Sequence, residues 1–96
     1  MFKVLVEGRA KADIQKGIDY YDEINKELGL KFEKAVDKEI TGLKKHALYQ
    51  IKYKNIRCKL IKNFPYLLHF TINETEKIVL VYALINTSKN PDKNWL

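Results

Sequence analysis

The spacing of apolar residues changes twice along this 96-residue chain, and these changes constrain the fold more than any single motif. In residues 1–7, Phe2, Val4 and Val6 fall at a period of two, which is typical of a strand. From Ala10 to Ala47 the apolar residues recur every three or four positions, as on one side of a helix. Beyond residue 49, β-branched and aromatic runs alternate with turn residues. This order predicts an α+β domain.

The helical stretch contains a glycine at position 29, where we expect the first helix to end. Glycine adopts the left-handed conformation that closes a helix at little steric cost. Residues 10–28 then form one helix, and a second follows at once, which predicts an antiparallel helical hairpin. Its apolar side should pack on the sheet through six residues, namely Ile14, Ile18, Tyr21, Phe32, Val36 and Ile40.

Three strands are expected in the second half, over residues 56–61, 66–72 and 78–85. The polar residues 73–77 read as a hairpin loop between the last two strands, and residues 86–96 read as a polar C-terminal tail. The predicted order is β-α-α-β-β-β, with the helices on one face of a mainly antiparallel sheet. Residues 1–96 are expected to form a single domain, because a chain of this length has no room for a second core.

The net charge of +6 is unevenly distributed. Residues 1–48 contain ten basic and nine acidic side chains, whereas residues 49–96 contain eight basic and three acidic ones. This asymmetry indicates an anionic partner, either a nucleic acid or an acidic protein segment. The alternative is a solvated basic face that serves solubility alone.

The strand over residues 56–61 carries two of these cations. Strand alternation separates Ile56, Cys58 and Leu60, assigned to the core, from Arg57 and Lys59, assigned to the opposite face. Residues 49–63 hold five cations, two tyrosines and no acid: Lys52, Lys54, Arg57, Lys59 and Lys62, with Tyr49 and Tyr53. Such a combination can hold a phosphate backbone and stack a base. The alternative is that the lysines protect an edge strand from pairing with other chains.

His69 lies inside the apolar strand over residues 66–72, on the same face as Leu67 and Thr71. Two interpretations stay open, a buried hydrogen-bonded histidine and a general acid or base. Cys58 is expected to be a buried thiol rather than a nucleophile. One cysteine and two distant histidines show no ligand spacing, so neither a metal nor another cofactor is expected.

The compartment is expected to be the cytoplasm. A single cysteine cannot form an internal disulfide, and no stretch approaches the roughly 20 apolar residues of a membrane span. The apolar part of residues 1–7 is too short for a signal peptide.

Several short motifs occur in a characteristic order. They are Ala10-Lys11-Ala12-Asp13-Ile14, Tyr20-Tyr21, Leu28-Gly29-Leu30-Lys31-Phe32, Ile56-Arg57-Cys58-Lys59, Phe64-Pro65-Tyr66 and Asn90-Pro91-Asp92 with Trp95. In this order and spacing they resemble the ParE/RelE toxin superfamily, and most closely its ParE-like branch, across essentially the whole chain.

This resemblance implies a curved sheet carrying a helical hairpin, and a type II toxin–antitoxin (plasmid stabilization) function. It also implies a cognate antitoxin whose acidic, partly disordered segment folds onto the sheet and last-strand surface. The assembly is compatible with a homodimer or with a heterotetramer that includes the antitoxin. RelE-like members of the superfamily cut mRNA on the ribosome without metal, whereas ParE-like members poison DNA gyrase.

Our preferred hypothesis is a gyrase poison whose target-binding residues are Arg57, Lys59, Lys62, Lys89, Lys93 and Trp95. The alternative is a ribosome-dependent mRNA endonuclease in which Arg57 stabilises the phosphate and Lys59 or His69 moves the proton. Leu67 stands where RelE-like enzymes place an arginine, and Asn86 stands where many members of the superfamily place a histidine. The set of catalytic residues of a RelE-like ribonuclease is therefore incomplete in this sequence. A third hypothesis is an inactive relative that retains antitoxin binding.

Overall fold

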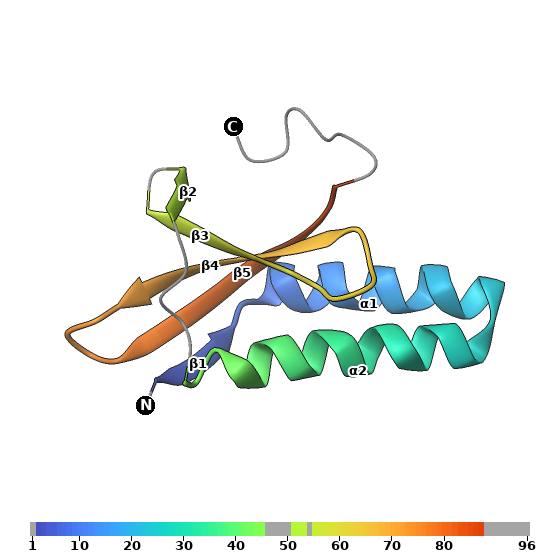
Figure 1. Ribbon diagram of the computed structural model, residues 1–96, viewed down its shortest axis with the longest axis horizontal. Coiled ribbons are helices and arrows are strands. Elements are labelled where there is room, and N and C mark those ends of the chain that lie inside the picture. The colour runs from blue at the N-terminus through green and yellow to red at the C-terminus, as the bar shows by residue number, and fades with distance from the viewer. Residues whose placement is uncertain (1, 46–50, 54, 88–96) are drawn as a thin grey trace.

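The computed structural model describes residues 2–45, 51–53 and 55–87, which form two helices and a five-stranded sheet (Figure 1). In chain order the elements are β1 (Lys3–Val6), α1 (Gly8–Ile24), α2 (Lys26–Gly42), β2 (Ile51–Tyr53), β3 (Ile56–Leu60), β4 (Tyr66–Asn73) and β5 (Ile78–Asn86). The predicted α+β class and the β-α-α-β-β-β order are confirmed, with β2 as an additional three-residue strand before β3.

The strands lie in the order β1-β5-β4-β3-β2. The β2–β3, β3–β4 and β4–β5 pairs are antiparallel, and β1 pairs in parallel with β5, from Lys3 opposite Ile78 to Val6 opposite Val81. The turn between β4 and β5 contains Lys77 at a φ of 59°, and the side chain of Asn73 accepts a hydrogen bond of 3.0 Å from the Glu76 amide. The polar segment 73–77 therefore joins these two strands as predicted.

The break between the helices lies at Asn25, so the boundary predicted at Gly29 is wrong. Asn25 has an extended backbone, and its side-chain oxygen accepts a hydrogen bond of 2.8 Å from the Glu27 amide at the start of α2. Gly29 lies buried inside α2, where a Cβ atom would collide with the Asp22 side chain of α1. Gly29 leaves room for the Asp22 side chain where the two helices approach each other, and it does not form a left-handed cap.

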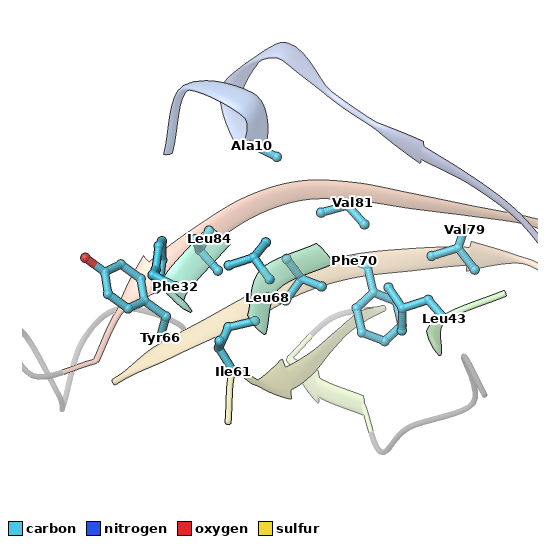
Figure 2. Close-up of a cluster of buried hydrophobic side chains, with 11 residues drawn as sticks. Ala10, Phe32, Leu43, Ile61, Tyr66, Leu68, Phe70, Val79, Val81 and Leu84 are labelled. Atoms are coloured by element: carbon cyan, nitrogen blue, oxygen red, sulfur yellow. The ribbon is translucent and has the colours of Figure 1, made fainter. Parts of the chain in front are cut away.

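The core lies between the helical hairpin and one face of the sheet (Figure 2). Phe32 and Val36 of α2 are completely buried, while the other four predicted contact residues, Ile14, Ile18, Tyr21 and Ile40, are half-buried and pack against the same cluster. The Phe32 ring lies 5.1 Å from the Tyr21 ring and 5.0 Å from each of the rings of Phe64 and Tyr66. The predicted packing of the hairpin on the sheet is thus confirmed.

Gly17 of α1 makes room for the Phe32 ring. A Cβ atom at Gly17 would lie 2.5 Å from Cε2 and 2.8 Å from Cζ of Phe32. The ring cannot move away easily, because Phe32 is completely buried among its neighbours. By contrast, a Cβ atom at Gly42, the last residue of α2, would meet no atom within 4 Å.

We therefore expect Gly17→Ala to lower the free energy of unfolding by about 1–3 kcal/mol through overpacking. Alanine favours a helix over glycine by about 1 kcal/mol, so helix propensity alone predicts the opposite sign. Urea unfolding followed by circular dichroism measures the change. Gly42→Ala is the matched control and should be neutral or slightly stabilising. Equal stability of the two variants would contradict the packing described here.

Candidate functional site

The two cations of β3 lie on the helix-bearing side of the sheet. Arg57 is paired with Phe70 and Lys59 with Leu68, and directly paired residues of antiparallel strands share a face. Phe70 and Leu68 are both completely buried in the core. Ile61, which follows Lys59 at a spacing of two, is also completely buried. Arg57 and Lys59 themselves are half-buried.

This arrangement corrects the face assignment made from the sequence. Leu60 was assigned to the core but is 55% exposed, on the open face of the sheet. Ile61 determines which side chains of β3 face the helices. Its side chain enters the core, and its backbone amide donates a hydrogen bond of 2.9 Å to the Tyr66 carbonyl oxygen. Cys58 is buried as predicted, but it is paired with His69 and therefore also belongs to the open face.

The open face carries a band of apolar side chains across the strands. Leu60, Leu67 and Ile85 are paired across β3, β4 and β5. Towards β1, Leu5 is paired with Leu80 and is 41% exposed. The apolar band of the open face therefore consists of two groups, Leu60, Leu67 and Ile85 towards one end of the strands and Leu5 and Leu80 towards the other. Leu5 and Leu60 leave apolar surface accessible opposite the helices.

A β-bulge divides this face. His69 is paired with Ala83 and Phe70 with Val81, so Tyr82 is an extra residue in β5. Because of the bulge, Val81 and Leu84 both enter the core although they are three residues apart. The sequence prediction of β5 did not include this shift.

Asp13 of α1 holds the part of β5 that lies beyond β1. The pairing of β1 ends at Val81, and the Leu84 amide donates a hydrogen bond of 3.0 Å to the Asp13 carboxylate instead. Arg9, one turn earlier in α1, lies 3.7 Å from the same carboxylate oxygen. This role of Asp13 was not predicted. The only indication of it in the sequence was the position of Asp13, three residues after Ala10.

His69 is 1% exposed and lies on the face opposite Arg57 and Lys59. Burial lowers the pKa of His69 to about 4, Arg9 acts in the same direction, and Asp13 opposes the shift. The imidazole is therefore neutral at pH 7. The burial predicted for His69 is confirmed, and Arg57, Lys59 and His69, the three residues proposed for RNA cleavage, do not lie on one face.

Lys62 belongs to a different surface, a groove between α2 and the turn that joins β3 to β4. The groove has a volume of about 460 Å³. Its lining combines apolar and basic side chains, and consists of Leu28, Lys31, Lys34, Ala35, Lys38, Glu39, Lys62, Asn63 and Phe64. We did not predict this groove, although the lysines at positions 31, 34 and 38 follow helical spacing.

The remaining candidate residues are placed as follows. Asn86 ends β5 opposite Tyr66. Lys89, Lys93 and Trp95 lie outside the described residues.

Among the residues that are described, no group of three or more His, Cys, Asp and Glu side chains could hold a metal ion. Neither helix in this part of the chain is long and apolar enough to cross a membrane.

Comparison with known proteins gives a result for the fold only. No family model matches the sequence, and no curated protein matches it. The structure matches a chain of the chromosomal ParDE toxin–antitoxin (TA) system from P. aeruginosa, with a TM-score of 0.79. The match covers 90% of this chain and 96% of that chain at 18% sequence identity. This chain thus shares its fold with a chain of that toxin–antitoxin system, as the ordered motifs implied.

The lowered pKa of His69 predicts a loss of stability in acid. The unfolded chain binds a proton at His69 below about pH 6.5, whereas the folded chain does so only near pH 4. The contribution of neutral His69 is complete above pH 6.5 and is lost as the pH falls towards 4, by on the order of 2 kcal/mol. Urea unfolding at pH 7 and pH 4.5 should show a smaller pH dependence for His69→Gln than for the wild-type chain. An NMR titration of His69 that gives a pKa above 6.5 would contradict this account.

Proposed function

We propose that this chain is the toxin component of a type II toxin–antitoxin pair and acts in the cytoplasm. The observation that carries the proposal is the fold match, which spans nearly the whole of both chains. The basic net charge and the apolar band on the open face support it, because both features suit a partner that is acidic and partly apolar.

The proposed partner is a cognate acidic antitoxin that covers the open face and the last strand. A partly disordered segment that folds on this surface would bury Leu60 and Leu5, which are 55% and 41% exposed. Its acidic residues would accelerate the encounter with a chain of net charge +6. The proposal is compatible with a homodimer and with a heterotetramer that includes the antitoxin.

The proposed target is DNA gyrase, which the chain would poison without hydrolysis. The supporting observation is the separation of His69 from Arg57 and Lys59 by the thickness of the sheet. A buried histidine with a pKa near 4 is a weak base at neutral pH and has no access to an RNA hydroxyl. The proposed target contacts are Arg57, Lys59, Lys62, Lys89, Lys93 and Trp95.

A ribosome-dependent mRNA endonuclease is the alternative activity. The observation in its favour is that Arg57 and Lys59 share one face of β3, two residues apart, as a pair of phosphate-binding cations would. Lys59 would then have to move the proton without His69. An inactive relative that retains only antitoxin binding is the third possibility.

Expression in growing bacteria tests the proposal directly. Growth should stop on induction and recover when the acidic product of the adjacent gene is co-expressed. Purified chain should inhibit the supercoiling activity of gyrase, while mapped mRNA 5′ ends in a translating extract should show no codon-positioned cuts. Codon-positioned cuts together with normal supercoiling would contradict the gyrase proposal and support the mRNA endonuclease. If neither effect is observed, the hypothesis of an inactive relative that retains antitoxin binding is supported.

A double variant distinguishes contact residues from general positive charge. Arg57→Ala with Lys59→Ala should reduce gyrase inhibition at least about tenfold if both side chains meet the target. Lys11→Ala with Lys16→Ala removes the same charge from exposed positions of α1 and should leave inhibition unchanged. Deletion of residues 89–96 tests the proposed contribution of the tail. Equal loss in the two double variants would show that only net charge matters.

A further inference from the structure

The sequence of β5 is compatible with two registers, that is, two ways of placing its residues opposite those of β4. β5 reads Ile-Val-Leu-Val-Tyr-Ala-Leu-Ile-Asn, so every residue but the last is apolar or aromatic. Alternation of apolar and polar residues fixes the register of a strand, because a slip of one residue then turns polar side chains into the core. β5 lacks this alternation, and its register therefore depends on other interactions.

The two registers differ beyond Val81. In the observed one, Leu84 is opposite Leu68 and enters the core, while Ile85 is opposite Leu67 on the open face. A ladder without the bulge shifts each later residue by one, so that Leu84 is opposite Leu67 on the open face and Ile85 turns to the core. The observed register packs a leucine against Leu68, whereas the alternative restores an uninterrupted ladder. Packing and strand pairing thus favour different registers.

One hydrogen bond exists in the observed register alone. Backbone amides of a strand point alternately to its two neighbours, and the Val81 carbonyl oxygen accepts a bond of 2.8 Å from Glu7, on the β1 side. Without the bulge, Ala83 would be the next residue to point to that side. With the bulge it is Leu84, whose amide donates a bond of 3.0 Å to the Asp13 carboxylate. In the alternative register the Leu84 amide points to β4 and the bond to Asp13 is lost.

The acceptor for this bond is held in place by α1. The Asp13 side chain is 22% exposed, and Arg9, one turn earlier, has its Nε 3.7 Å from the same oxygen, Oδ2. Because α1 is continuous from Gly8 to Ile24, the carboxylate cannot follow β5 through a slip of one residue, which moves the strand by about 3.4 Å. Asp13 therefore distinguishes between the two registers.

We propose that Asp13 selects the register of β5 and thereby the composition of the open face. In the observed register Ile85 and Ala83 face that side. In the alternative, Leu84 and Tyr82 replace them, and the end of β5 moves by one residue along β4. Asp13 is thus a positioning residue for the surface that the proposed antitoxin covers, and this last step rests on the proposed function.

The variant Asp13→Ala removes the acceptor and tests the proposal. Loss of a hydrogen bond to a charged group shifts an equilibrium by roughly ten- to a hundredfold, so the population of the alternative register should rise at least about tenfold. NMR distinguishes the registers, because α-protons of residue pairs without mutual hydrogen bonds lie close together in antiparallel strands. The wild-type chain should give a nuclear Overhauser effect (NOE) between the α-protons of Leu68 and Leu84. Asp13→Ala should give one between Leu68 and Ala83.

Two variants serve as controls. Asp19 is exposed on α1 and accepts a hydrogen bond from Gln15 within the same helix, so Asp19→Ala should keep the wild-type NOE. Asp13→Asn should also keep it, since its amide oxygen can still accept the bond from Leu84. A folded Asp13→Ala chain that retains the wild-type NOE alone overturns the proposal. The same holds if Asp19→Ala changes register to the same extent.

A combined variant decides the case in which Asp13→Ala does not fold. Deletion of Tyr82 removes the extra residue, so that an uninterrupted ladder again places Leu84 opposite Leu68. Together with Asp13→Ala, this deletion should restore both folding and the wild-type NOE. A combined variant that stays unfolded would show that Asp13 is required for folding in either register, which overturns register selection.

Binding of the adjacent gene product separates this inference from the toxin assignment. If Asp13→Ala changes register as expected but the product does not bind the wild-type chain, register selection is supported and the antitoxin partnership fails. If the product binds and Asp13→Ala keeps the wild-type NOE, the partnership is supported and register selection is overturned.

Discussion

The fold depends on one aromatic ring in the narrow space between the two helices and the sheet. Phe32 of α2 contacts the rings of Tyr21 on α1, Phe64 in the turn after β3, and Tyr66 on β4. Gly17 admits the ring by presenting no Cβ atom. Because Phe64 is held in this cluster, the turn that carries Lys62 stays beside α2. The basic groove is thus a direct consequence of core packing.

The sheet separates two kinds of surface, and the pairing of β3 decides which residue belongs to which. Burial of Ile61 directs Arg57 and Lys59 to the helix side and leaves Leu60 on the open face. The open face consequently exposes apolar side chains, whereas Arg57 and Lys59 of β3 lie on the other side of the sheet. A partner that used both the open face and the groove beside α2 would have to wrap around an edge of the molecule, as an extended chain can and a compact domain cannot.

Sequence patterns predicted the elements well because each had a clear period. The helical spacing of Ile14, Ile18, Phe32 and Val36 correctly predicted a hairpin packed on the sheet. Gly29 was misread because a glycine that ends a helix and one that lets two helices touch look alike in sequence. The phase of β3 was ambiguous because Leu60 and Ile61 are adjacent and equally apolar, and only tertiary packing selects between them. The groove beside α2 was not predicted because it joins residues that are far apart in the sequence.

The parallel pairing of β1 with β5 also determines when the native sheet can form during synthesis. Lys3–Val6 are paired with residues 78–81. The first strand to be synthesised therefore cannot pair until β5, the last strand of the described chain, has been made. The bond from Leu84 to Asp13 imposes the same delay on the start of α1. Until most of the chain has been made, β1 lacks its neighbour in the sheet and the helices lack much of the surface that they cover. The native surface is therefore assembled only late in synthesis.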